Sequence, residues 1–217
     1  MKNLLLLLTL VISINLLSQT QKEIDSYYEE ICLNTEFDGK LSEPAKFKEN
    51  VYIYFESSKE DSIYFYDEFL TIVAELNDLI ETIEVIPTTN KIFSDVEVYL
   101  GDSEGWLSTI EFIQSDEQIE RKRKLLEKNY GFFFTRGSKT EIRMAYAFIN
   151  TKVFTGSKGG KNTPAIKHLM WEEITQSFGL YNDSFTYPES IFYQGWTKST
   201  LGYCDIDKEI IKKLYNN

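Results

Sequence analysis

The segment from residue 51 to residue 100 carries the pattern that most restricts the possible folds. Side chains alternate in type along Val51–Phe55, which is rich in β-branched and aromatic residues. This pattern predicts a strand. A helix capped by Asp61 is predicted next, with a buried stripe at helical spacing: Phe65, Phe69, Ile72, Val73, Leu76 and Ile80. Two further strands are predicted at 83–86, which ends at Pro87, and at 96–100. This order requires a sheet with a helix packed against it.

The second half of the chain continues this mixture of strands and helices. Strands are predicted at 132–134 and 141–149, and the charged run 116–128 is predicted to form either a short solvated helix or an insertion. A glycine-containing connector at 155–162 leads to a helix at 164–178, which Pro164 and Gly179 bracket. We therefore predict an α+β domain with a mixed twisted sheet, a long helix, a second helix that carries the polar motif, and a C-terminal helix.

Charge and composition exclude two classes of protein. The chain has 217 residues, which favours a single domain, and its net charge of −11 would repel a phosphate backbone. We therefore expect no nucleic acid partner. One histidine and two cysteines are too few for an ordinary three-His or four-Cys zinc site.

The N-terminus has the character of an export signal. A basic start precedes an apolar run at residues 4–17, which is shorter than the roughly 20 residues that a membrane span needs. We predict a signal peptide at 1–18, cleaved near Ser18 or Gln19, with an uncleaved anchor as the alternative. The mature protein would be periplasmic or secreted, would meet the membrane only during export, and would consist of a polar leader at 19–50 and a domain at 51–217.

The two cysteines leave the redox state open. Outside the cytoplasm Cys32 and Cys204 can form a disulfide, and closing such a long loop would contribute about 4 to 5 kcal/mol in the chain-entropy model. Two separately buried thiols are equally compatible with the sequence, because small buried cysteines are common.

The helix predicted at 164–178 carries the most informative residues. Its core stripe repeats every four residues: Ile166, Met170, Ile174 and Phe178. His168, Glu172 and Gln176 repeat at the same interval on another face, and Glu173 lies beside them. The helix therefore presents adjacent carboxylates and a carboxamide close to its C-terminal end.

This segment resembles the zinc-binding motif of the metzincins. Glu172-Glu173-Ile174-Thr175-Gln176-Ser177-Phe178-Gly179-Leu180-Tyr181-Asn182 has the length and glycine placement of the metzincin pattern H-E-x-x-H-x-x-G-x-x-H. Residues 190–193 (S-I-F-Y) are similar to the S-I-M-Y of the Met-turn in that clan, and 205–215 resembles its terminal D-x-x-x-I-x-x-L-Y helix. The segment is also similar to a family of exported bacterial proteins of unknown function with the pattern E-E-[LI]-[TA]-Q-x-[LF]-G-x-x-N-D. The resemblance implies a zincin-like, metzincin-like fold for residues 51–217.

The resemblance also shows where the chain departs from an active zinc peptidase. The three zinc-ligand positions fall on Glu172, Gln176 and Asn182, the position of the catalytic base falls on Glu173, and the Met of the turn is Phe192. Carboxamides are weak zinc donors, so we expect neither a zinc ion nor another cofactor. His168 and Glu172 form an i, i+4 pair that could hold a metal, but a lone histidine of this kind is more often a surface residue.

Three functions fit these residues. The first is a non-catalytic pseudo-peptidase or binding module, in which Asn182, Asp183, His168 and Tyr193 contribute to binding an extended peptide or another envelope protein. In its plainest form the same polar side chains only satisfy buried groups. The second is a metal-free hydrolase with Glu173 as general base, assisted by Gln176 and Glu172. The third is a sugar-stacking surface that uses Trp106, Trp171 and Trp196.

Overall fold

The computed structural model describes residues 19–35, 39–40, 43–110, 115–126, 129–152, 163–195 and 200–216. The predicted signal peptide at 1–18, the connector at 155–162 and Trp196 lie outside the described residues.

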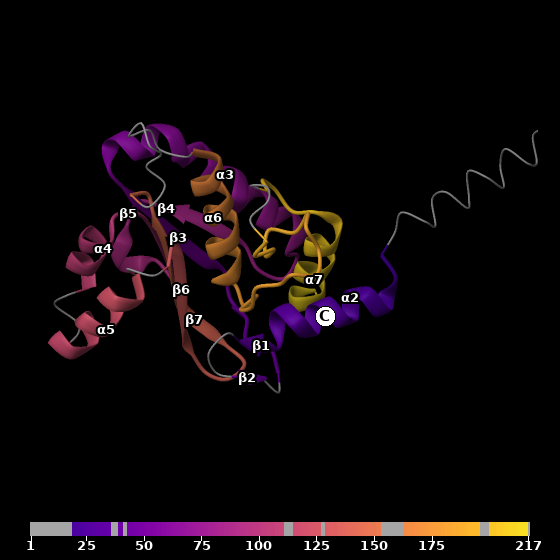
Figure 1. The fold of residues 1–217 in the computed structure, drawn as a ribbon. Helices are drawn as coiled ribbons and strands as arrows, with labels where there is room; N and C mark the ends of the chain where they lie inside the picture. Colours follow the sequence, from indigo (N-terminus) through magenta and orange to yellow (C-terminus); the bar gives the residue numbers. More distant parts are fainter. Residues whose placement is uncertain are drawn as a thin grey trace, which may run out of the picture.

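A five-stranded mixed sheet forms the centre of the domain, with the strand order β4-β3-β5-β7-β6 (Figure 1). The strands are β3 (Val51–Ser57), β4 (Val85–Thr88), β5 (Val96–Gly101), β6 (Gly131–Gly137) and β7 (Ile142–Asn150). Neighbouring strands run parallel except β6, which pairs with β7 in the antiparallel sense. A separate two-stranded sheet joins β1 (Asn34–Thr35) to β2 (Gly39–Lys40). The sheet and its helices confirm the α+β class.

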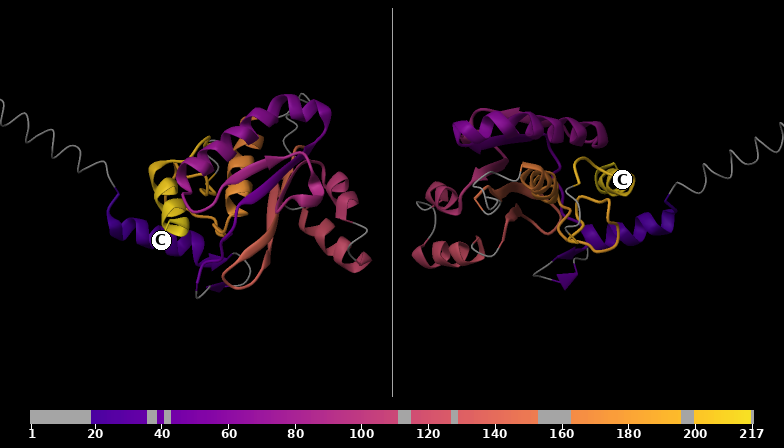
Figure 2. Two further views of the ribbon diagram at one scale, coloured as in Figure 1. Left: turned by 180° about the vertical axis from the view of Figure 1, so that it is seen from behind. Right: turned by 45° about the horizontal axis from the view of Figure 1, so that its top comes forward.

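The main core lies on the face of the sheet that α3 (Lys59–Leu79) and α6 (Thr163–Gln176) cover (Figures 1 and 2). The six apolar positions predicted for the long helix are all buried there. Its first turn differs slightly from the prediction, because the Ser58 hydroxyl accepts a hydrogen bond from the N–H of Asp61 at 3.0 Å. Ser58 is therefore the cap, and the helix begins earlier than expected.

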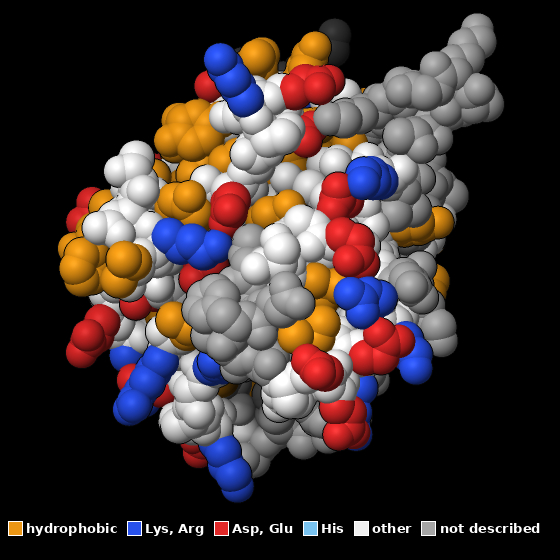
Figure 3. Space-filling view, turned by 90° about the vertical axis from the view of Figure 1, so that its left-hand side faces the viewer, with side chains coloured by type: hydrophobic (Ala, Val, Ile, Leu, Met, Phe, Trp, Pro, Cys, Tyr) orange, Lys and Arg blue, Asp and Glu red, His pale blue; other side chains and the backbone are white. Residues whose placement is uncertain are grey.

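A second core lies on the opposite face, under α4 (Ser103–Ile110) and α5 (Asp116–Leu126) (Figure 2). It consists of Trp106, Leu107, Ile119, Leu126 and Phe148, with Tyr99, Phe132 and Phe134 packed against it. The charged run predicted as a solvated helix is indeed helical, but Ile119 and Leu126 anchor one side of it to the sheet. Basic, acidic and apolar side chains are interspersed on the surface seen from this side (Figure 3).

The segment predicted as a polar leader contains α2 (Gln21–Cys32). Thr20 and Glu23 form a capping box at its start, and Tyr27, Ile31 and Cys32 are buried in the main core. The helix lies beside α7 (Asp205–Tyr215) (Figure 1). Part of residues 19–50 therefore contributes to the core of the domain.

The two edges of the sheet differ in chemistry. The outer strand β4 contains Pro87, which has no N–H to offer a further strand. The sequence prediction ended this strand at Pro87, but a proline is tolerated in an edge strand and β4 continues to Thr88. The opposite outer strand, β6, contains no proline and pairs only with β7 among the described residues.

Both cysteines are free thiols, so the disulfide alternative is not realised. Cys32 is buried in α2, and Cys204 caps α7 with its thiol 3.2 Å from a carboxylate oxygen of Asp207. The 3-10 helix η1 (Lys91–Phe93) connects β4 to β5. Among the described helices, none has the length and apolar character needed to cross a bilayer.

Candidate functional site

The helix α6 carries the candidate motif and ends at Gln176, two residues before the end predicted at 178. Gly179 adopts a φ of 106°, which favours glycine, and an added Cβ there would overlap the carbonyl oxygen of Ala45. The chain can therefore turn sharply into residues 180–195. Every residue from Leu169 to Gln176 is buried, so the polar side chains of the motif lie inside the protein.

His168 and Glu172 form one polar group on this helix. The Glu172 carboxylate accepts a hydrogen bond from the Gln194 side chain at 2.8 Å, and Nε2 of His168 lies 3.9 Å from Oε2 of Glu172. Nδ1 of His168 lies 2.9 Å from the carbonyl oxygen of Thr200. His168 is only 2% exposed, and burial lowers its pKa, so the expectation of a surface histidine is wrong.

Gln176 belongs to a second polar group. Its side-chain amide donates to Oδ1 of Asp183 at 2.7 Å. The backbone N–H of Asn182 donates to the carbonyl oxygen of Ile31 in α2, which fixes the chain after the helix. The three positions that correspond to zinc ligands are therefore engaged separately: Glu172 with Gln194, Gln176 with Asp183, and the Asn182 backbone with α2.

Glu173 points in a different direction from Glu172. Its carboxylate lies against the backbone of Gly131 at the start of β6, so closely that a Cβ at position 131 would overlap Oε1. The two adjacent carboxylates thus diverge, one toward residue 194 and the other toward the edge strand, as expected for neighbours about 100° apart on a helix. No three His, Cys, Asp or Glu side chains of the described residues are close enough to share a metal ion.

Aromatic contacts continue along the inner side of β6. The ring of Phe133 stacks on Tyr181 with centroids 5.9 Å apart, and the hydroxyls of Thr135 and Tyr181 lie 3.4 Å apart. Tyr181 follows the motif helix in the chain, so this stack joins the segment after Gly179 to the edge strand. Glu173 and Tyr181 together line the inner side of β6 from residue 131 to residue 135.

The segment that contains Tyr193 forms the other boundary of the site. Ser184 and Tyr193 form an isolated parallel β-bridge, and the ring of Phe185 meets Tyr193 edge-on at 6.3 Å. Phe185 is 76% exposed. Residue 194, which follows Tyr193, supplies the amide that binds Glu172, so this bridged segment is tied directly to α6.

A buried carboxylate holds the turn at residues 190–193. Asp207 of α7 accepts hydrogen bonds from the Ser190 hydroxyl at 2.6 Å and from the Ile191 N–H at 3.1 Å. The Tyr27 hydroxyl donates in turn to Ser190 at 2.8 Å. Burial raises the pKa of Asp207 to about 6, against the opposing effect of these hydrogen bonds. Phe192, which lies within this turn at the position of the Met, is fully buried.

The comparison with known families covers nearly all of this structure. Residues 21–217 match the model of a family described as Protein of unknown function (DUF2927). The chain belongs to this family. No curated protein matches the chain. Membership in DUF2927 confirms the expected relationship to a family of unknown function, and the match begins at α2, which agrees with the place of that helix in the core.

Two of the tryptophans proposed for sugar stacking in this DUF2927 chain are inside the protein. Trp106 belongs to the second core, and Trp171 donates from its indole to Glu68 at 2.6 Å while its ring meets Tyr203 edge-on. Each is 2% exposed, so neither ring can stack on a sugar. Their large apolar rings serve as packing instead.

Sequence reasoning missed three residues that organise the site. Asp207 lies in the quoted D-x-x-x-I-x-x-L-Y segment, and that segment was the only available signal for its importance. Gly131 and Gln194 carry no comparable signal, because each acts on a carboxylate distant in the sequence. The fold is needed to bring them together.

Proposed function

We propose that this DUF2927 chain is a non-catalytic, metzincin-like module that binds an extended peptide along the edge strand β6. The proposal includes a zincin-like architecture, which the order of elements supports: a strand, a long helix, further strands, the motif helix, a turn and a terminal helix. It also includes export after removal of residues 1–18, which N-terminal sequencing of the mature protein would test.

The donor chemistry at the former ligand positions does not fit a catalytic zinc site. Two of the three positions carry carboxamides, which hold zinc poorly against water. The amide of Gln176 donates to Asp183, and Glu172 accepts from Gln194, so both side chains already serve internal hydrogen bonds. Such links stabilise the segment after the helix without any metal.

The observation that carries the proposal is the position of β6 at the edge of the sheet, beside α6. Among the described residues β6 has one strand neighbour, and its inner side is lined by the Glu173 carboxylate and the Tyr181 ring. An extended peptide that adds to a sheet edge gains backbone hydrogen bonds, and its side chains reach pockets on alternate faces. The proline-containing edge at β4 is poorly suited to the same role.

Hydrogen exchange tests the proposal on the mature chain. With a bound peptide, we expect slower exchange at backbone amides of β6 and unchanged exchange at β4, because only the β6 edge would gain hydrogen bonds. A Thr135→Pro substitution should weaken the binding, since it removes one backbone donor and disturbs the strand. Protection at β4 instead of β6, or stoichiometric zinc in protein purified without added metal, would contradict the proposal.

A metal-free hydrolase is the second candidate, because Glu173 is a buried carboxylate directly beneath the edge at which a peptide would bind. A carboxylate in this position could act as general base on a water molecule. The divergence of Glu172 from Glu173 counts against a shared active centre. Cleavage of a peptide library that disappears in Glu173→Gln, while peptide binding persists, would favour the hydrolase over the binding module.

A further inference from the structure

Two basic side chains lie over one aromatic ring on the outer face of β6. Nζ of Lys122, from α5, is 4.3 Å from the ring centre of Phe134 and 5.3 Å from that of Trp106. The guanidinium carbon of Arg136 is 5.8 Å from the ring centre of Phe134 and 5.9 Å from that of Tyr146. Phe134 and Tyr146 stack on each other with centroids 4.4 Å apart, so the two cations share one aromatic platform.

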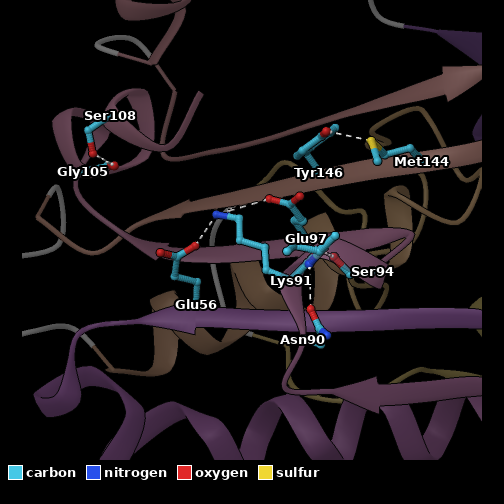
Figure 4. A network of polar contacts seen from close by, with 10 residues as sticks. Glu56, Asn90, Lys91, Ser94, Glu97, Gly105, Ser108, Met144 and Tyr146 are labelled. Carbon is cyan, nitrogen blue, oxygen red and sulfur yellow. Dashed lines mark hydrogen bonds and ion pairs between the residues drawn. The ribbon is translucent and has the colours of Figure 1, made fainter. Parts of the chain in front are cut away.

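Lys122 and Arg136 have no ion-pair partner among the described residues. The basic residues near them on this face differ in this respect. On α5 the neighbouring cations are each paired with glutamate: Arg121 with Glu117 at 2.6 Å, Arg123 with Glu104 at 3.1 Å, and Lys124 with Glu120 at 3.7 Å. Across the same face Lys91 lies between Glu56 and Glu97, at 2.6 and 3.5 Å (Figure 4). In a chain with 34 acidic and 23 basic residues, two adjacent cations without a carboxylate are unusual.

The local electrostatics favour an incoming anion. Lys122 is half-buried, and this desolvation, with the charge of Arg136, lowers its pKa to about 8. A carboxylate near both groups would relieve their mutual repulsion and replace the lost solvation. The aromatic rings and the two cations are therefore packed together, but no carboxylate of the described residues balances the positive charge.

The pleat of β6 connects this platform to the proposed peptide. Phe132, Phe134 and Arg136 face α5, whereas Phe133 and Thr135 face Tyr181 on the other side. A residue of an added strand points to the same face as the β6 residue opposite it. Guest side chains opposite Phe134 or Arg136 would thus reach the two cations, and those between them would reach the Phe133–Tyr181 stack.

We propose that the β6 edge selects extended peptides in which acidic residues alternate with apolar ones, the acidic side chains binding between Lys122 and Arg136. This inference rests on the proposed addition of a peptide strand to β6. It adds the chemical class of the partner, an acidic segment of another protein chain.

The test compares labelled synthetic peptides that alternate valine with aspartate, asparagine or lysine, titrated against the full mature chain by fluorescence anisotropy. We expect the aspartate peptide to bind at least about tenfold more tightly than the asparagine peptide, since a charge-assisted contact is worth about 1.5 kcal/mol or more. The Lys122→Gln, Arg136→Gln double variant should lose this preference. Arg121→Gln with Lys124→Gln removes the same charge from exposed, already paired positions of α5 and should retain it.

The possible results distinguish the acidic selectivity from the strand addition at β6 on which it rests. Equal binding of the aspartate and asparagine peptides, or a preference that survives the double variant, would overturn the acidic selectivity and leave strand addition standing. Preferential binding of the lysine peptide would overturn it as well. If no peptide binds and the β6 amides gain no protection, the strand-addition proposal itself fails, and the selectivity falls with it.

Discussion

Gly131 determines where the Glu173 carboxylate lies. The missing Cβ at the start of β6 leaves the space that this carboxylate fills, and the burial of Glu173 limits where else it could move. A single small residue on the edge strand therefore directs the carboxyl group of Glu173 toward the strand and away from Glu172. The same contact explains why two carboxylates adjacent in the sequence do not form one site.

We expect Gly131→Ala to lower the free energy of unfolding by about 1 to 3 kcal/mol, because the new methyl group overlaps the carboxylate of Glu173. Chemical denaturation of the mature chain measures this cost. In a Glu173→Ala background the same substitution should cost much less, because the overlapping atoms are absent. Equal costs in both backgrounds would show that the two residues are not in contact.

The hydrogen bonds between the motif side chains and their partners could not be predicted from the sequence. The motif helix identified Glu172, Glu173 and Gln176 as candidates, but their partners come from other segments, such as Gln194, which is 22 residues from Glu172. Hydrogen bonds of this kind leave no periodic trace in a sequence. His168 was misjudged for the same reason, since its burial depends on the segment near Thr200.

At the scale of elements, α7 stabilises the turn before it through one carboxylate. Asp207 accepts bonds from Ser190, from the backbone of Ile191 and from Cys204, and Tyr27 of α2 extends this network. The turn at 190–193 is therefore held by two helices that lie far apart in the sequence. Because the turn precedes Gln194, the terminal helix also helps to position the partner of Glu172.

The ionisation of Asp207 should give the stability a measurable dependence on pH. Its pKa rises from 3.8 to about 6 on folding, so the folded state holds the proton more tightly than the unfolded state. The stabilisation is complete below about pH 4 and is lost as pH rises through about 6, by roughly 3 kcal/mol in total. Denaturation at a series of pH values should show this slope in the wild type and its loss in Asp207→Asn.

The exposed Asp205, two residues earlier on α7, supplies the control, and Asp205→Asn should keep the slope. His168 contributes in the opposite sense, because its lowered pKa costs stability as pH falls below about 6.5, but this effect is common to all three proteins. A slope in Asp207→Asn equal to that of the wild type would show that Asp207 is not the titrating group.

The elements themselves were largely predictable from the sequence. In the long helix, β3 and β5, apolar side chains recur at the spacing expected when one face of the element is buried. These elements could therefore be predicted with small errors at their ends. The α2 helix was missed because its buried side chains are few and lie among acidic residues. Its burial depends on contact with α7, which no local pattern reports.

For the whole molecule, the absence of a disulfide between Cys32 and Cys204 means that non-covalent interactions hold the fold together. We expect the thermal unfolding midpoint to be the same with and without dithiothreitol. Burial raises the pKa of both thiols, and Cys32 is fully buried, so it should react with a thiol reagent only after unfolding. A midpoint that falls on reduction would reveal a covalent link.

The unequal edges of the sheet limit how this molecule can associate. Among the described residues β6 pairs with β7 alone, while Pro87 leaves the β4 edge without one N–H for a further strand. If strands add at β6 as proposed, copies of the protein should not stack edge to edge in an endless array, since Pro87 makes the other edge a poor acceptor of a further strand. A complex built on this sheet should stop growing after a single addition, and its stoichiometry should be one guest strand per chain.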